Sequence, residues 1–170
     1  TILRPVSYFE NFENKIPGYN FSKKVFPGII SKDIKWQTIA VDDIGKWVRG
    51  VLSQSDEYKN QSINIAGEEL TGQEMSTILE KIVYTEGIKT NYVMIPRIAL
   101  KLLERDIAVM ADWIERSGYG ADMNKIKKIQ DELQISPTSL EKWIKSKLDK
   151  ENNQIKQSTS ELKESQWNYN

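Results

Sequence analysis

Near the start of the sequence, four consecutive side chains could bind or position a ligand: Tyr8, Phe9, Glu10 and Asn11. They follow Thr1 to Leu3, predicted to be the end of a buried strand, and Pro5, which cannot continue the ladder of a central strand. Ligands of open α/β sheets bind just outside the carboxyl ends of the strands, where these four side chains would lie. The spacing also fits a capped loop in which Asn11 bonds its own backbone and Phe9 is in the core.

A different place for chemistry is the acidic pair Asp42 and Asp43. Two carboxylates can act as acid and base, but adjacent residues at a helix start do not face each other. Carboxylates at that position suit the free amides and the positive end of the helix. We therefore predict that one of the two aspartates caps a helix.

Composition excludes several kinds of site. The 170-residue chain contains no cysteine and no histidine, so thiolate catalysis, disulfides, serine-histidine systems and histidine-ligated metals are absent, and we predict no metal site. Lysine plus arginine and aspartate plus glutamate both number 24, which gives no basic surface expected for direct nucleic-acid binding. No apolar run is long enough to span a bilayer. We expect a soluble, cytoplasmic protein.

The elements that would position these residues alternate between strand and helix. Strands are predicted at 35–41 and 62–66, and Glu68 and Glu69, which follow the latter strand, are expected to be solvated. A helix after Asp43 carries an apolar stripe expected to pack on the sheet: Ile44, Trp47, Val48, Val51 and Leu52. Thr71 and Glu74 form a capping box at the start of a helix that Gly87 ends, with Met75, Ile78, Leu79, Ile82 and Val83 on one face.

Helices dominate the C-terminal part of the chain. A strand at 89–95 precedes helices at 96–104 and 106–117, whose stripes, expected inward, are Ile98, Leu102, Leu103 and then Ile107, Met110, Trp113, Ile114. These helices could instead form a substrate lid or a partner surface. Gly118-Tyr119-Gly120 breaks the run, Asp122 starts another helix, and Ser136 or Ser139 caps a last one. We predict one domain over 1–148 and a polar, disordered tail over 149–170.

Three segments carry a family resemblance. The first, TILRPVSYFENF, resembles the LRPxxFxEN segment of NmrA-like proteins, which are atypical short-chain dehydrogenase/reductases. Residues 39–79 resemble the family's following strand, acidic helix start and "LTxxE" helix. Residues 110–120 and 139–144 resemble its aromatic-rich ending. Because the chain begins in mid-strand and has no glycine-rich dinucleotide motif, we expect it to be the C-terminal half of such a protein.

The resemblance implies an α/β fold, the C-terminal half of a doubly wound NAD(P)-binding Rossmann fold with a helical substrate lobe. It implies that the intact protein binds NADP(H), with NAD(H) as the alternative, and that Tyr8, Phe9, Glu10 and Asn11 lie beside the nicotinamide. In that site Glu10 would fix the loop rather than touch the anionic ligand. Tyr19 and Lys23 match the YxxxK motif of short-chain dehydrogenases, but Pro17 and Gly18 disfavour the helix that the motif needs, so we treat the match as chance.

Three functions remain open. The first is a redox- or cofactor-sensing regulator that signals to a protein partner, because many family members resemble sensors without a catalytic tyrosine. The next is an NADPH-dependent reductase of quinones or other small electrophiles. The third, from another class, is a partner-binding helical module without cofactor. A tyrosine or lysine facing the nicotinamide would favour the reductase.

Overall fold

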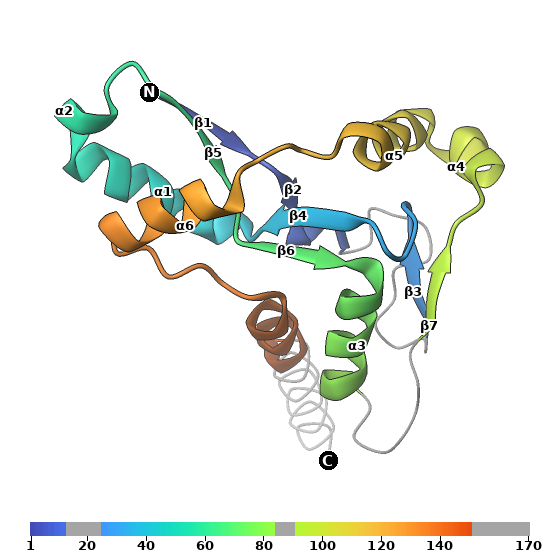
Figure 1. The fold of residues 1–170 in the computed structure, drawn as a ribbon. Helices are drawn as coiled ribbons and strands as arrows, with labels where there is room; N and C mark the ends of the chain where they lie inside the picture. The colour runs from blue at the N-terminus through green and yellow to red at the C-terminus, as the bar shows by residue number, and fades with distance from the viewer. Residues whose placement is uncertain (13–24, 84–90, 151–170) are drawn as a thin grey trace, which may run out of the picture.

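Parallel strand pairs form the framework of the protein, in a computed structural model that describes residues 1–12, 25–83 and 91–150 (Figure 1). Strand β1 (Ile2–Pro5) pairs with β5 (Ser62–Ile65), and β3 (Val25–Gly28) pairs with β7 (Asn91–Met94). Strand β2 (Ser7–Tyr8) pairs with β4 (Lys35–Ile39), and β6 (Glu68–Thr71) lies antiparallel on the other side of β4. The strands predicted at 35–41, 62–66 and 89–95 are thus confirmed in the described residues, although β4 ends at Ile39 and Val41 begins a helix.

Helices cover and connect these ladders. They are η1 (Phe9–Phe12), α1 (Val41–Ser53), α2 (Ser55–Tyr58), α3 (Gly72–Val83), α4 (Arg97–Leu103), α5 (Arg105–Ser117) and α6 (Met123–Glu132), and residues 140–150 are also helical. In Figure 1 the β1–β5 pair lies with α1 and α6 at one end of the molecule, and the β3–β7 pair lies with α4 and α5 at the other. The predicted α/β class is confirmed.

The buried side chains gather in two clusters that correspond to these two ends. The first includes Phe12, Trp36, Leu79 and Trp143, and the second includes Trp47, Ile65 and Ile129. Tyr119 packs against both. This single tyrosine therefore lies where the two parts of the core meet.

Three helix starts have the predicted side-chain caps. The Thr71 amide donates to the Glu74 carboxylate at 2.7 Å and the Glu74 amide donates to the Thr71 hydroxyl at 3.2 Å, which is the predicted capping box. Asp122 accepts from the amides of Asn124 and Lys125. Of the two serines proposed for the last helix, Ser139 accepts from the Lys142 amide.

The prediction that Asp42 or Asp43 caps α1 is wrong. The cap position is Ala40, without a side-chain hydrogen bond. Asp43 is buried and instead accepts from the Thr138 amide at 2.6 Å and the Thr138 hydroxyl at 2.8 Å, and it pairs with Lys46 at 2.6 Å. Its carboxylate therefore fastens α1 to the segment just before the last helix, although the two are far apart in the sequence.

Glu68 and Glu69 are not solvated as predicted, because both lie in β6 and have partners. Glu68 is half-buried and accepts from the Leu140 amide at 2.8 Å. Glu69 pairs with Lys35 at 2.9 Å and accepts from Gln37. These contacts join β6 to the last helix on one side and to β4 on the other.

Several predicted buried side chains are exposed. Ile2 in β1 is 59% exposed, since β1 has one strand neighbour, β5, among the described residues. The apolar stripes predicted for α1 and α5 are only partly buried, because each helix packs through a narrower face than its apolar residues cover. Trp47, Val51 and Ile114 are buried, whereas Val48, Leu52 and Trp113 are exposed. The inward stripe predicted for α4 is wrong, because Ile98, Leu102 and Leu103 are all exposed and the helix buries Leu100 instead. The stripe predicted for the 71–83 helix lies inward at Met75 and Leu79.

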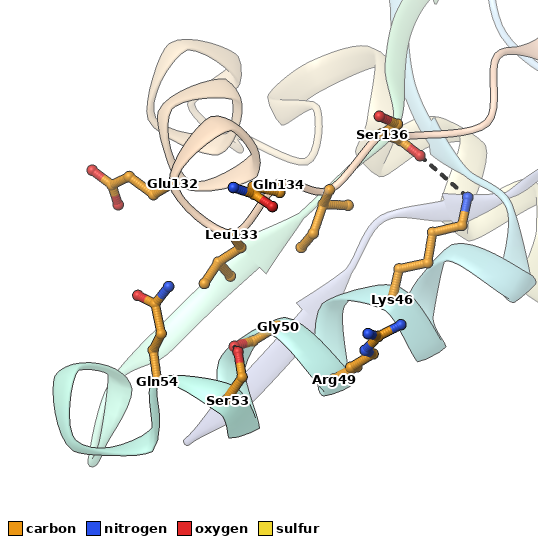
Figure 2. A pocket seen from close by; sticks show the side chains of 10 residues that line it. Lys46, Arg49, Gly50, Ser53, Gln54, Glu132, Leu133, Gln134 and Ser136 are labelled. Carbon is orange, nitrogen blue, oxygen red and sulfur yellow. Dashed lines mark hydrogen bonds between the residues drawn. The ribbon is translucent and has the colours of Figure 1, made fainter.

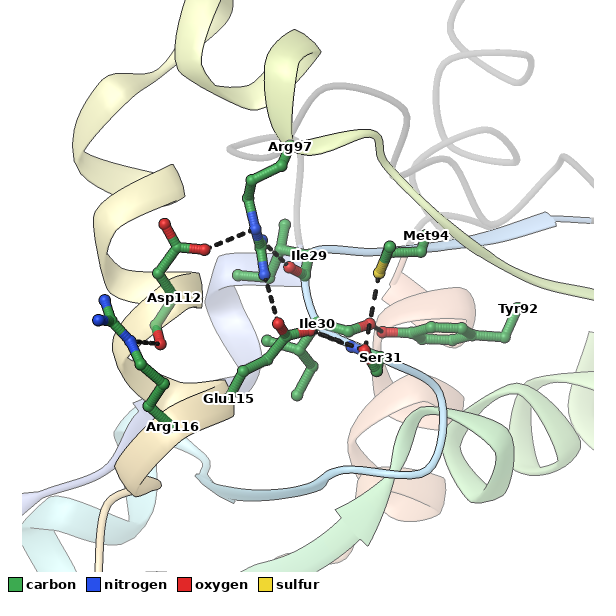
Figure 3. Close-up of polar contacts among 9 residues, drawn as sticks. All are labelled: Ile29, Ile30, Ser31, Tyr92, Met94, Arg97, Asp112, Glu115 and Arg116. Carbon is green, nitrogen blue, oxygen red and sulfur yellow. Dashed lines mark hydrogen bonds and ion pairs between the residues drawn. The ribbon is translucent and has the colours of Figure 1, made fainter.

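Arg97 at the start of α4 ties the α4–α5 pair to the end of β3 (Figure 3). Its guanidinium pairs with Asp112 at 2.8 Å and Glu115 at 2.9 Å, and donates to the Ile29 carbonyl. Glu115 also accepts from the Ser31 amide at 2.7 Å and hydroxyl at 2.9 Å. This network holds the helical lobe against the strand ends.

Three predictions lie wholly or mainly outside the described residues. They are the Tyr19-to-Lys23 match, the helix end at Gly87 and the disordered tail, of which residues 149 and 150 continue the last helix. Within the part of the chain that the structure describes, no helix combines the length and apolarity needed to cross a membrane.

Candidate functional site

The segment after β1 changes its strand partner at the carboxyl end of the ladder. The Val6 amide donates to the Ile65 carbonyl of β5 at 3.3 Å, whereas Ser7 and Tyr8 pair with Thr38 and Ile39 of β4. The chain therefore crosses from one parallel neighbour to another within two residues. A crevice outside the carboxyl ends of parallel strands, where neighbours change, is the usual ligand position in such sheets.

The four predicted site residues divide into two pairs. Tyr8 and Asn11 are half-buried at the edge of the segment, and the Asn11 amide donates to the Ser7 hydroxyl at 3.4 Å. Phe9 is fully buried and its ring lies 5.7 Å from that of Trp143. Phe9 therefore holds the segment to the core, while Tyr8 and Asn11 keep part of their surface accessible.

Glu10 fixes this segment to two helices. One carboxylate oxygen accepts from the Val41 amide at the start of α1, and the other accepts from the Trp143 indole, both at 3.1 Å. A carboxylate at a helix start also suits the positive end of the helix dipole. Both carboxylate oxygens are engaged, so Glu10 fastens this segment to α1 and to the last helix.

Tyr119 joins this site although it is not among the four predicted site residues. It lies between Gly118 and Gly120, both in the left-handed region at φ of 60° and 63°, where glycine is favoured. Gln37 anchors the same loop by donating to the Ala121 carbonyl at 2.7 Å and accepting from the Ala121 amide at 3.2 Å. The Tyr119 ring meets that of Trp113 edge-on at 5.2 Å. The Gly-Tyr-Gly pattern in the sequence marked only a break between helices and gave no sign that the tyrosine lies at the site.

The phenol of Tyr119 lies in a buried polar environment. Burial raises its pKa above the ordinary value of 10.0, while the nearby Ser7 hydroxyl and Trp36 indole lower it. Neither the Trp36 indole nitrogen nor the Thr38 hydroxyl has a hydrogen-bond partner of normal geometry among the described residues. Buried polar atoms without partners are rare and are often completed by water or a ligand.

The site therefore offers hydrogen-bond donors and acceptors together with aromatic surface. Two tyrosines, an amide and the Ser7 hydroxyl converge from β2, η1 and the loop after α5. No group of three or more acidic side chains that could hold a metal occurs in residues 1–12, 25–83 and 91–150. These groups suit a planar ring bearing an amide, such as nicotinamide.

A solved structure shares the fold at low sequence identity, and another shows a weaker likeness. A nucleoside-diphosphate-sugar epimerase from Staphylococcus aureus is 14% identical, with a TM-score of 0.64, over 83% of this chain and 50% of that chain. An L-threonine dehydrogenase from Phytophthora infestans is 12% identical, with a TM-score of 0.44, over 78% of this chain and 46% of that chain. The chain thus spans about half the length of these structures.

The epimerase likeness supports the Rossmann-like arrangement predicted from the sequence. A search of curated protein sequences finds no match. The NmrA-like family model, in contrast, matches residues 1–161, which includes both the site segment and the last helix. The chain belongs to the NmrA-like family.

Proposed function

We propose that the intact protein binds a nicotinamide dinucleotide, NADP(H) in preference to NAD(H), and acts as a regulator that reports the state of this cofactor to a protein partner. The main supporting observation is the segment after β1, which carries Tyr8 and Asn11 at the carboxyl end of parallel strands and is held there by Glu10. Membership of the NmrA-like family supports the choice of ligand.

Each residue has a distinct role in this proposal. The Tyr8 ring covers the nicotinamide and its ribose, and the Asn11 amide offers hydrogen bonds to the carboxamide. Phe9 and Glu10 fix the segment that carries them, through Trp143 and the start of α1. When bound, the cofactor would supply hydride-transfer chemistry, and the residues of this chain would bind and orient it.

A partner surface is available on the helical lobe. Large apolar side chains are exposed on α4 and α5: Ile98, Leu102, Leu103, Val109 and Trp113. Soluble monomers seldom expose large contiguous apolar patches, which mark binding surfaces when they occur. The Arg97 network fastens these helices to the strand ends, so a change at the strand ends has a route to the partner surface.

Tyr119 favours another candidate, an NADPH-dependent reductase of quinones or other small electrophiles. A tyrosine phenol is protonated at neutral pH, so it can donate a proton to a substrate that accepts a hydride. It lies beside Ser7 and Tyr8 rather than on the outer surface.

The test uses the intact protein and begins with binding. Titration with NADPH should quench tryptophan fluorescence saturably, and Asn11→Ala should weaken binding roughly tenfold because a hydrogen-bonded amide is lost. The matched control is Asn124→Ala, an exposed asparagine at the start of α6, which should bind like the original protein. Absence of saturable binding would favour the cofactor-free helical module.

A further measurement separates regulator from reductase. NADPH absorbance is followed with a panel of quinones and carbonyl compounds. Oxidation that requires one acceptor and is lost in Tyr119→Phe would assign the protein as a reductase. Tight binding without oxidation by any acceptor supports the regulator.

A further inference from the structure

A separate cavity of about 700 Å³ lies between α1 and the turn that ends α6 (Figure 2). One face of α1 forms one wall, with Lys46, Arg49 and Ser53, and the residues after α6 form the other, with Gln134 and Ser136. The volume is within the range of small-molecule sites. None of its lining residues belongs to the segment Tyr8 to Asn11 or to the Tyr119 loop.

The shape of the cavity depends on the close approach of α1 to the turn after α6 and on the unusual backbone conformation of that turn. A Cβ atom at Gly50 would lie 3.2 Å from Leu133 and 3.3 Å from Ile135, so glycine lets the turn approach α1. Gln134 has φ of 53°, a left-handed conformation usually given to glycine at a helix end. A glutamine at this position keeps an amide side chain at the cavity.

The carbonyl groups at the end of α6 are already occupied. The amides of Leu133, Gln134 and Ile135 donate to the carbonyls of Ile129, Asp131 and Gln130. On the α1 side, the Ser53 hydroxyl donates to the Gly50 carbonyl at 2.7 Å. The partial negative charge of these two helix ends is therefore directed into the protein's own hydrogen bonds rather than left free for a cation.

Among the charged side chains of the cavity, Arg49 differs from the others. Lys46 pairs with Asp43 at 2.6 Å and also donates to the Ser136 carbonyl at 3.2 Å. Glu132 accepts from the Tyr58 hydroxyl and lies 3.8 Å from Lys128. Arg49 is exposed and has neither an ion pair nor a hydrogen bond with any described part of the chain. Its guanidinium is thus available to an external ligand.

We propose that this cavity binds a small organic oxyanion, a carboxylate or a phosphate ester, through Arg49. The planar guanidinium matches the two oxygens of either group with a pair of parallel hydrogen bonds. The side-chain amides of Gln54 and Gln134 line the same space and receive the polar remainder of the ligand. Leu133 and Ile135 supply an apolar floor.

The experiment is an NMR titration of the intact, ¹⁵N-labelled protein with inorganic phosphate and, separately, with citrate. We expect saturable shifts of the Gly50, Ser53 and Gln134 amide signals with at least one of the two. Arg49→Gln should weaken binding roughly tenfold or more, because a charge-assisted pair of hydrogen bonds is lost. Arg49→Lys keeps the positive charge but cannot form the pair of parallel hydrogen bonds, so it should give an intermediate affinity.

The matched control is Arg105→Gln, which removes another exposed arginine, on α5, and should leave binding unchanged. Equal affinity in Arg49→Gln, shifts confined to other regions, or no saturable shift with either anion would overturn the proposal. NADPH titration of the same Arg49→Gln sample should match the original protein. The cavity and the proposed cofactor site can therefore fail independently.

Discussion

Two glutamates, Glu115 and Glu68, have pKa values displaced in opposite directions. Replacing each by glutamine should therefore change the free energy of unfolding at neutral pH in opposite directions. Partial burial raises the pKa of Glu115, but two hydrogen bonds from Ser31 and the charge of Arg97 together outweigh it and hold the pKa below its ordinary value of 4.5. A depressed folded-state pKa stabilises the fold above the unfolded value and loses this effect as pH falls through the folded value. Glu115→Gln should therefore lower the free energy of unfolding at pH 7, and the difference should shrink in acid.

Glu68 serves as the contrasting case. Burial raises its pKa, the Leu140 amide lowers it, and Glu141 raises it further, with a net increase. Its charged form is therefore disfavoured in the folded protein, so Glu68→Gln should be neutral or stabilising at pH 7, with the gain fading as pH falls. Urea unfolding of each variant at acidic and neutral pH measures whether its free energy of unfolding rises or falls relative to the original protein. The same pH trend for the two variants would contradict this interpretation.

At the scale of single residues, the sequence predicted local contacts well and distant contacts poorly. The Thr71–Glu74 capping box needs only residues three apart, and it forms as expected. Asp43 and Glu68 have partners at Thr138 and Leu140, whose nearness follows from the path of the whole chain. No local pattern of residues encodes such a contact. The position of Tyr119 at the candidate site likewise depends on the path of the whole chain, so the sequence did not predict it.

At the scale of elements, Gly28 lets β3 lie under the ring of Tyr92 in β7. A Cβ at position 28 would lie 1.8 Å from the Tyr92 hydroxyl oxygen, and the ring cannot move freely because it stacks on Phe26 at 5.9 Å and donates to the Ile30 carbonyl at 2.5 Å. Gly28→Ala should lower the free energy of unfolding by about 2 to 3 kcal/mol. Thermal and urea unfolding measure the change.

Gly45→Ala is the matched control for this substitution. Gly45 lies in α1 and a Cβ there would meet nothing within 4 Å. Alanine should therefore stabilise the helix by roughly 0.5 to 1 kcal/mol. If both alanines had the same effect, the close packing of Tyr92 on Gly28 would not be present in solution.

The attachment of the last helix to α1 predicts a further difference between neighbours. Asp43 is buried and receives two hydrogen bonds from Thr138 and the charge of Lys46, so Asp43→Asn should lower the free energy of unfolding by about 2 kcal/mol. Asp42 is exposed one residue earlier. Asp42→Asn should change it by less than about 0.5 kcal/mol. Urea unfolding of the two variants measures both changes. Equal losses of free energy of unfolding would mean that the two aspartates act only through their charge at the start of the helix.

Most helices and the strands β4, β5 and β7 followed from the sequence, but the strands β3 and β6 and the buried faces of the helices did not. Periodicity located α1, α4 and α5, because an apolar stripe at helical spacing requires only local order. It could not tell that Leu52 and Leu102 would be exposed, at 68% and 82%, since the sequence does not state how wide a face each neighbour covers. The exposed apolar side chains of α4 and α5 form the surface proposed for a partner.

At the scale of the whole molecule, Tyr119 links the two core clusters. It packs against both, and its ring also meets Trp113 of α5. Tyr119→Ala should lower the free energy of unfolding by about 2 kcal/mol, because a half-buried aromatic ring is lost at the junction. Tyr119→Phe keeps the ring and should lose about 1 kcal/mol or less.

Native-state hydrogen exchange shows whether the junction couples the two clusters. In the original protein the amides of Leu79, in the first cluster, and Ile129, in the second, should exchange with similar opening free energies, because the clusters unfold together. In Tyr119→Ala these two values should separate, whereas Tyr119→Phe should keep them together. Equal values in all three proteins would mean that contacts such as those between Gln37 and Ala121 couple the clusters without the tyrosine ring.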